Sequence, residues 1–252
     1  MPMKKNGTVL HELDGQKGEL VTTVVQAVFQ FFKLISERQL AWLLKHKSQV
    51  IGAILNALCA LVEVASQPDH AELRKEQEKF YSEVLGMVVD LSELTIPTKP
   101  EGDWWLIVVA PGVTYNQIIA ALRKLFPVWV YANDLDKVID MAKEQRQVTD
   151  KPYAVWVKAN VEADSNNANK SANNLVNTNQ TTLKERLLLE GVYFKRTGRH
   201  LDVSNWTLCA GSRSLGGGIP HVYWHGDGGE LGVDWCHPGR CDGRLRSRSV
   251  SS

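Results

Sequence analysis

The sequence predicts an α+β fold with a helical N-terminal part, a small α/β unit and a β-rich C-terminal part. Three patterns support this division. Apolar residues recur at helical spacing up to about residue 95, and short apolar runs alternate with capped helices between residues 103 and 160. After a short helix, residues 199–252 alternate with period two between glycine-rich turns. The 252 residues suffice for one large domain or two to three small ones.

Residues 1–95 are expected to form a helical bundle, because they carry three apolar stripes at three- and four-residue steps. The first stripe consists of Leu20, Val24, Val28, Phe31 and Ile35. Ser36 and Gln39 form a capping-box pattern for the next helix, and the third stripe follows Pro68. The pattern fits a module for homo-oligomerisation or partner docking, and it fits a core-filling helical layer equally well.

Residues 103–160 are expected to form a compact α/β unit after a proline-containing linker at 95–102. The predicted strands are residues 105–110, 127–131 and 153–157. Thr114 and either Asn133 or Asp134 are predicted to cap the two helices between these strands.

Residues 164–182 are polar and rich in asparagine. A segment with so few apolar residues buries too little surface to offset the entropy lost on ordering, so a mobile loop is predicted. Residues 183–252 then form the third predicted domain.

Bulk composition argues against several classes of protein. A formal net charge of +1 gives no indication of a nucleic-acid partner, and four cysteines are too few for a disulfide framework. The apolar stretch at residues 50–65 is shorter than a bilayer span of about 20 residues and contains Glu63, so no membrane span is expected. The N-terminus shows no secretory signal. Cytoplasmic residence is therefore the default expectation, with surface display through a partner as an alternative.

Two short strands, residues 220–225 and 231–236, each have one apolar face and one face of mixed chemistry. The residues expected to form the scaffold core are Trp206, Val222, Trp224, Leu231, Val233, Trp235 and Leu245. The arginines of the last strand are expected to anchor loops by hydrogen bonds.

Catalytic and metal chemistry fit the sequence poorly. His221, His225, Cys236, His237 and Cys241 lie close in sequence, but no Cys-x-x-Cys pair is present. His221 and His225 would stand roughly 13 Å apart on one strand face. A Gly-x-Ser-x-Gly elbow and a phosphate-binding glycine loop are also missing. No enzyme activity, metal or cofactor is expected, and a zinc-dependent enzyme using these five residues is the alternative hypothesis.

The C-terminal part also lacks common surface residues. After Lys195 the chain has no Lys, Gln or Met, and Glu230 is its one Glu. Lys and Glu usually dominate exposed positions. The residues on the mixed faces can all be written by codons that end in a pyrimidine, whereas Lys, Glu, Gln, Met and Trp cannot.

Several segments resemble the variable proteins of diversity-generating retroelements, particularly those from small-genome bacteria. They are residues 153–157 (Tyr-Ala-Val-Trp-Val), 161–164 (Val-Glu-Ala-Asp), 170–173 (Lys-Ser-Ala-Asn), 183–188 (Leu-Lys-Glu-Arg-Leu-Leu), 200–203 (His-Leu-Asp-Val), 206–213 (Trp-Thr-Leu-Cys-Ala-Gly-Ser-Arg) and 245–248 (Leu-Arg-Ser-Arg). In that family a reverse transcriptase miscopies the adenines of a template, and the copy replaces the 3′ end of the target gene. Asn codons then become any codon ending in a pyrimidine.

The resemblance implies a C-type-lectin-like fold for residues 183–252 and a non-catalytic, hypervariable ligand-binding surface. The expected ligand is an unknown molecule, with a protein favoured. The residues predicted to be displayed, here called the display set, are Leu215, Gly218, His221, Tyr223, His225, Gly232, Asp234, Cys236, His237, Gly239, Arg240, Cys241 and Gly243. A structural subunit that assembles through the N-terminal helices is a third hypothesis.

Overall fold

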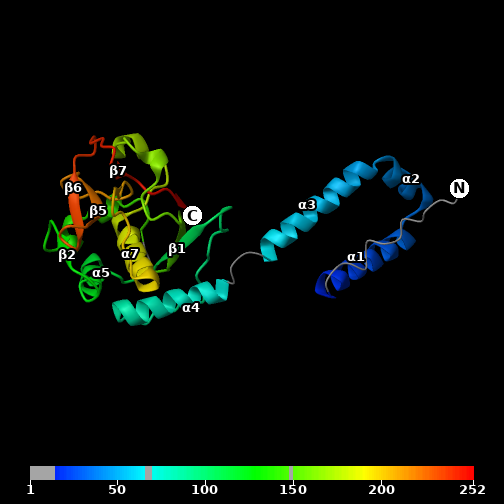
Figure 1. Ribbon diagram of the computed structural model, residues 1–252, viewed down its shortest axis with the longest axis horizontal. Coiled ribbons are helices and arrows are strands. Elements are labelled where there is room, and N and C mark those ends of the chain that lie inside the picture. Colours follow the sequence, from blue (N-terminus) through cyan, green and yellow to red (C-terminus); the bar gives the residue numbers. More distant parts are fainter. Residues whose placement is uncertain (1–14, 66–69, 148–149) are drawn as a thin grey trace. The chain divides into compact units, whose positions relative to one another are not determined.

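The structure, a computed structural model, describes residues 15–65, 70–147 and 150–252 (Figure 1). Within these ranges the fold is mixed α+β, as predicted, with seven α-helices and two β-sheets. The chain divides into two compact units, Met1–Gln67 and Pro68–Ser252. In the part of the chain that is described, no helix combines the length and the apolar character needed to cross a bilayer.

Three helices form the described part of the first unit: α1 Gly15–Leu34, α2 Glu37–Lys45 and α3 Lys47–Ala65. The predicted capping box starts α2. The backbone N–H of Gln39 donates to the Ser36 hydroxyl, and the backbone N–H of Ser36 donates to the Gln39 side chain at 2.8 Å. Although α2 packs against α3, no side chain described between residues 19 and 57 is buried.

The third predicted helix belongs to the second unit, so the bundle expected over residues 1–95 is divided after Gln67. This segment comprises α4 His70–Phe80 and a π-helical turn, η1 Tyr81–Leu85. The Tyr81 hydroxyl donates to the Val108 carbonyl and accepts from the Ala110 N–H, both at 2.9 Å. These two bonds and the full burial of the Tyr81 ring fix the segment to the sheet that follows, which sequence periodicity alone does not reveal.

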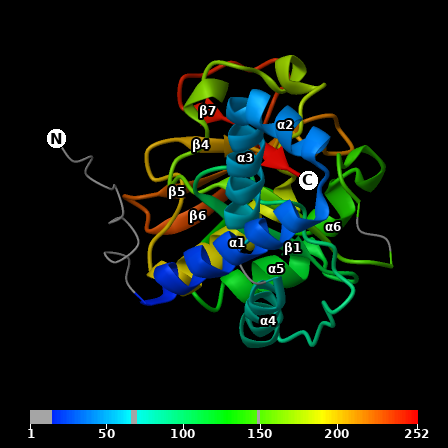
Figure 2. The same cartoon turned by 90° about the vertical axis from the view of Figure 1, so that its right-hand side faces the viewer.

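The second unit contains two sheets (Figures 1 and 2). The three-stranded sheet has the order β1 Trp104–Val109, β3 Tyr153–Lys158, β8 Val250–Ser251, and both of its pairs are antiparallel. The five-stranded sheet has the order β2 Val128–Val130, β6 Glu230–Cys236, β5 Ile219–His225, β4 Trp206–Leu208, β7 Leu245–Arg246. Because β2 and β8 each pair with a strand far away in sequence, both sheets join early and late parts of the chain.

The strands predicted between residues 103 and 160 are present, but they do not form a separate α/β unit. β1 and β3 lie in one sheet and β2 in the other. The predicted caps are confirmed: Thr114 caps α5 Tyr115–Leu122 and Asp134 caps α6 Leu135–Val138. Local sequence patterns therefore predicted the positions of these strands and helices correctly. The long-range pairing of β2 with β6 and of β3 with β8 joins residues 103–160 to the C-terminal part in one unit.

Helix α7 Leu183–Thr197 lies between the sheets and contacts β1 and β5 (Figure 1). All its residues from Leu183 to Tyr193 are buried. A helix buried all round must satisfy its polar side chains inside the protein, and α7 carries Arg186 and Glu190 there.

These side chains belong to a buried charge network with two further residues, Asp202 and Arg248. Arg186 donates to Glu190 at 2.8 Å and to Asp202 at 2.9 Å, while Arg248 donates to Asp202 at 2.6 Å. Arg248 also donates to the carbonyls of residues 160 and 161, which fulfils the expected anchoring role of a C-terminal arginine. The Thr207 hydroxyl donates to Asp202 as well. Two cations and two anions thus compensate one another away from water.

We expect Asp202→Ala to lower the free energy of unfolding by about 3–5 kcal/mol, because it leaves two buried arginines without their shared partner. Asp242→Ala is the matched control: Asp242 pairs with Arg240 at the surface at 3.3 Å, and such a pair contributes less than about 1 kcal/mol. Denaturant unfolding of the full chain measures both values. Similar losses in the two variants would contradict the structural role of the network.

Glu144 is a buried carboxylate outside this network. It follows the 3-10 turn η2 Met141–Lys143, and its Oε1 has no hydrogen-bond partner among the described residues. Burial, with a smaller contribution from the charge of Glu185, raises the pKa of Glu144 to about 7. A Glu in the unfolded chain has a pKa of about 4.3. Between this pH and the folded pKa of about 7, the folded protein keeps a proton on Glu144 that the unfolded chain releases.

Stability arising from this proton is greatest below pH ~4.3 and is lost as the pH rises through the folded pKa of about 7. Glu144→Gln cannot ionise, so we expect it to exceed the wild type by about 2–4 kcal/mol at pH 8.5 and to approach it at pH 5. Denaturant unfolding at the two pH values gives the comparison. A stability difference that does not change with pH would refute the shifted pKa.

Candidate functional site

The five-stranded sheet has two chemically different faces. Along the β5–β6 ladder, the pair Val222–Val233 and the residue Leu231 point to the main core and are fully buried. Trp224 and Trp235 are partly buried against the same core. The alternating residues of both strands point to the opposite side. Along β5 and β6 the core-facing side is therefore apolar, whereas Thr207 of β4, which pairs with Val222 on that side, joins the buried charge network.

The opposite side, here called the aromatic face, carries Trp129, Trp206, His221, Tyr223 and Asp234. Strand register explains how it is assembled. Trp129 of β2 pairs with Gly232 of β6, which in turn pairs with Tyr223 of β5. In β4, Thr207 pairs with Val222 on the core side, so the preceding residue, Trp206, points to the opposite side. Four strands thus contribute to one surface. Tyr131, just after β2, extends it and is 67% exposed.

Three rings of the aromatic face, those of Trp206, His221 and Tyr223, contact one another. The Trp206 and His221 ring centroids lie 5.4 Å apart with the planes 25° from parallel, and the Trp206 and Tyr223 centroids lie 5.3 Å apart. The guanidinium groups of Arg240 and Arg244 stand over the Trp206 ring at 5.5 Å and 4.9 Å from its centroid. These stacked, partly buried rings give a rigid surface with charged groups at its edge.

His221 lies deep in this stack and is only 2% exposed. Burial lowers its pKa to about 4, with a further lowering contribution from Arg240, while Asp234 acts in the opposite direction. The imidazole is therefore neutral at pH 7. It acts in the face as an aromatic ring, although the sequence predicted a displayed polar residue.

Leu245 is a core residue as predicted, while Trp206 is only partly buried and packs against the same small cluster from the aromatic face. Trp206 lies on the aromatic face, since β4 pairs with β5 in a register that places it beside Tyr223. Leu245 is fully buried in a core cluster separate from the main core, and this cluster also contains Cys236, which was predicted to be displayed. That cluster also contains Ala172, so residues of the Asn-rich segment cover this end of the face.

The other members of the display set lie at the edges of the face and in its loops. Leu215 is 67% exposed and lines a hollow of about 460 Å³ with Tyr131, Gly218 and Asp234. His225 is exposed at the end of β5. The loop between β6 and β7 exposes His237, Gly239, Arg240, Cys241 and Gly243. The hollow and the aromatic face share Asp234 and form a continuous candidate binding surface.

Gly232 makes room for Tyr223. A Cβ atom built on Gly232 would lie 2.6 Å from Cζ of Tyr223, closer than real Cβ contacts, because the Tyr223 ring lies over the Gly232 backbone. Gly226, in the turn that follows β5, has nothing within 4 Å of the same position. The ring orientation of Tyr223 therefore depends on the absence of a side chain at residue 232.

The sequence alone did not predict Trp129, Tyr131 and Arg244 at this surface. The first two could have been predicted, because residues 127–131 alternate in the same way as residues 220–225 and 231–236: Val128 and Val130 pack against the core, and Trp129 and Tyr131 alternate with them. Nothing in the sequence indicates that β2 pairs with β6, so their membership in this face follows only from the fold.

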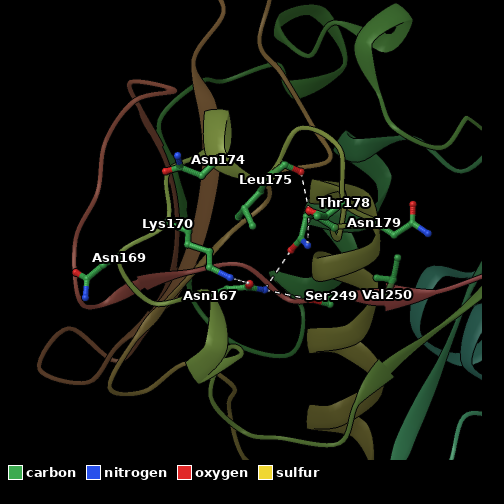
Figure 3. Close-up of a pocket in the computed structure, with 10 residues that line it drawn as sticks. Asn167, Asn169, Lys170, Asn174, Leu175, Thr178, Asn179, Ser249 and Val250 are labelled. Atoms are coloured by element: carbon green, nitrogen blue, oxygen red, sulfur yellow. Dashed lines mark hydrogen bonds between the residues drawn. The ribbon is translucent and has the colours of Figure 1, made fainter.

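The Asn-rich segment, predicted to be a mobile loop, contains two 3-10 turns, η3 Ser165–Asn167 and η4 Ala172–Leu175. The buried Asn167 amide donates to the Ser247 carbonyl at 3.0 Å and to the Ser249 hydroxyl at 3.1 Å. Figure 3 shows Asn167 directed at Ser249, beside Lys170, in an amide-lined hollow of about 640 Å³. Side-chain amides thus order this segment together with its few buried apolar residues, Ala172 and Leu175.

The alternative zinc hypothesis depends on convergence of Cys and His side chains. Among the described residues, no group of three or more His, Cys, Asp or Glu side chains is placed to hold a metal ion. The imidazoles have separate local contacts instead: His221 stacks on Trp206, while His225 and His237 each accept a backbone N–H at 3.1 Å from Gly228 and Gly239.

Comparisons of the chain with models of known protein families, with curated proteins and with solved structures give no match.

We expect Gly232→Ala to destabilise the protein by about 1–3 kcal/mol through displacement of Tyr223, whereas Gly226→Ala changes stability little. Combining Gly232→Ala with Tyr223→Ala removes the clash, so the double variant is expected to be more stable than the sum of the single changes by about 0.5–3 kcal/mol. Unfolding measurements on the four proteins of this cycle give the coupling, and strictly additive values would contradict the contact.

Proposed function

We propose that the chain is a non-catalytic binding protein whose aromatic face and adjoining loops are diversified by retroelement-mediated adenine mutagenesis. The observation that carries the proposal is the contrast between the two faces of one sheet. One face is fixed by burial in the main core, and the other combines aromatic rings, arginines and loops with a residue bias that excludes Lys, Gln and Met after Lys195.

The proposed frame is a C-type-lectin-like domain, as the resemblance implies. Two features are compatible with it: the C-terminal strand β8 pairs with the early strand β3, and the antiparallel strands β4, β5 and β6 form the sheet that bears the aromatic face. Exposed residues on a rigid sheet and in the loops at its edge can be substituted without disrupting the packed core.

A protein is the ligand that this surface suits best. Tyr, Trp and Arg dominate binding energy at protein interfaces, and Tyr223, Trp206 and Arg240 meet on the face. Rings already held by stacking lose little conformational entropy on binding. Because His221 is neutral at pH 7, the centre of the face carries no buried positive charge.

Tryptophan separates the fixed from the variable part of this surface. Trp has no codon that ends in a pyrimidine, so Trp206 and Trp129 cannot arise from mutagenised Asn codons. The proposal therefore assigns them as constant anchors, although Trp129 is 41% exposed. Tyr223, Asp234 and Arg240 are variable positions around them.

Sequencing the 3′ end of the gene across a population of cells tests this proposal. We expect substitutions at Tyr223, Asp234 and Arg240 and constancy at Val222 and Trp206, because one side of the sheet must stay packed and Trp is not a product of the mechanism. A near-copy of the 3′ end that differs mainly at adenines, next to a reverse-transcriptase gene, is expected nearby. Equal variation on both sides of the sheet, or a genome without such a copy, would refute the proposal.

A further inference from the structure

The first unit exposes an unusual amount of apolar surface. Large apolar side chains are exposed along all three of its helices, and no side chain described between residues 19 and 57 is buried. The exposed residues are Val25, Val28, Phe29, Phe31, Phe32, Leu34, Leu40, Trp42, Leu44, Ile51, Ile54 and Leu55. Scattered single apolar residues are normal on protein surfaces, but contiguous patches of this kind indicate an interaction site.

In α1 the apolar residues are gathered on one side. At 100° per residue, the polar side chains of residues 19–34 occupy a narrow stripe, and the apolar ones cover roughly three fifths of the circumference. The polar stripe consists of Glu19, Thr22, Thr23, Gln26, Gln30 and Lys33. Within the apolar arc, Val25, Phe29 and Phe32 follow one another at four- and three-residue steps, the spacing of helices that pack side by side. An arc this wide is more than one neighbouring helix can cover.

In α3 the apolar surface is broader still. Its polar residues include Gln49 in the first turn and Asn56, which are seven residues apart on one line of the helix. Ile51 and Leu55 are more than half exposed on the other side. α2 contacts α3 but buries none of its own side chains. A helix with so little polar surface is stable in water only when other helices cover it.

We propose that the first unit joins copies of this chain into a homo-oligomer through the apolar surfaces of α1 and α3. The exposed apolar side chains present on the order of 1,000 Å² per chain, which matches the ~800 Å² per partner of a stable protein–protein interface. A second copy supplies equally apolar, equally wide helical surfaces. Because each arc exceeds what one helix covers, the assembled interface contains helices from at least two copies packed around a shared core.

A second copy fits this surface better than lipid. α1 carries Glu19, Gln26, Gln30 and Lys33 along its length, and α3 carries Asn56 near its middle. A helix in contact with lipid has to bury or exclude such groups, whereas in an oligomer they face water or bond between helices.

Light scattering of the full-length protein during size-exclusion chromatography tests the proposal. We expect a mass that is a multiple of 28.2 kDa. In Val25→Ser/Phe29→Ser/Phe32→Ser the dissociation constant is expected to rise at least about 100-fold, because three interface side chains are lost. Thr23→Ser/Gln26→Ser/Gln30→Ser, on the polar stripe of the same helix, is the matched control and keeps the wild-type mass. Ile51→Ser/Leu55→Ser in α3 is expected to dissociate as well.

Two further measurements keep the result interpretable when a variant unfolds the helices. A photo-crosslinking side chain in place of Phe29 is expected to join two chains, and one in place of Gln26 is not. Vesicles of neutral and of anionic phospholipid test the lipid alternative by co-sedimentation. A wild-type monomer, an oligomer that survives both apolar variants, or a monomer that sediments with vesicles would each overturn the proposal.

Discussion

The buried charge network centred on Asp202 is the constraint on which the second unit depends. Asp202 receives Arg186 from helix α7 and Arg248 from the last residues of the chain, so one carboxylate joins segments that sequence order separates widely. Burial of charges is tolerated only when their partners are fixed in place. The network therefore fixes the positions of α7, of the loop at residue 160 and of the segment before β8, and Thr207 extends it to β4, a strand of the aromatic face. The charge network around Asp202 therefore helps to keep the aromatic face rigid, because Thr207 links it to β4.

The sequence predicted local structure well because local chemistry determines it. Ser36, Thr114 and Asp134 cap the helices for which they were proposed, and the alternation in β5 and β6 separates core residues from the rest. Assembly was predicted less well. The pairing of β2 with β6 brings Trp129 to the site, and the register of β4 places Trp206 on the aromatic face, against the smaller core cluster. Long-range pairing reflects contacts between residues far apart in sequence, which periodicity does not encode. The ordered structure around Asn167 was not predicted for a similar reason. Its amide donates to the carbonyl of Ser247, far away in sequence, and a low apolar content does not reveal such a hydrogen bond.

The two units differ in how much of their apolar surface is buried. In the second unit, one side of the five-stranded sheet is buried against α7 and the other is held by ring stacking, so its exposed residues rest on an internally stable frame. In the first unit, α1 and α3 expose large apolar side chains along their length. The proposed oligomer would place several aromatic faces in one assembly. Several weak contacts to a repetitive target then act together, because the second contact forms at a high effective concentration.

The placement of the Tyr223 ring over Gly232 has a combinatorial consequence. If each position of a diversified surface accepted any residue independently, the number of possible surfaces would be the product of the choices at each position. Here a large ring at residue 223 is compatible with glycine at residue 232, and a side chain at 232 requires a different arrangement at 223. The residues allowed at positions 223 and 232 therefore depend on each other. Many encoded combinations therefore fail to give a well-packed face, and selection acts on pairs of residues across β5 and β6 as well as on single positions.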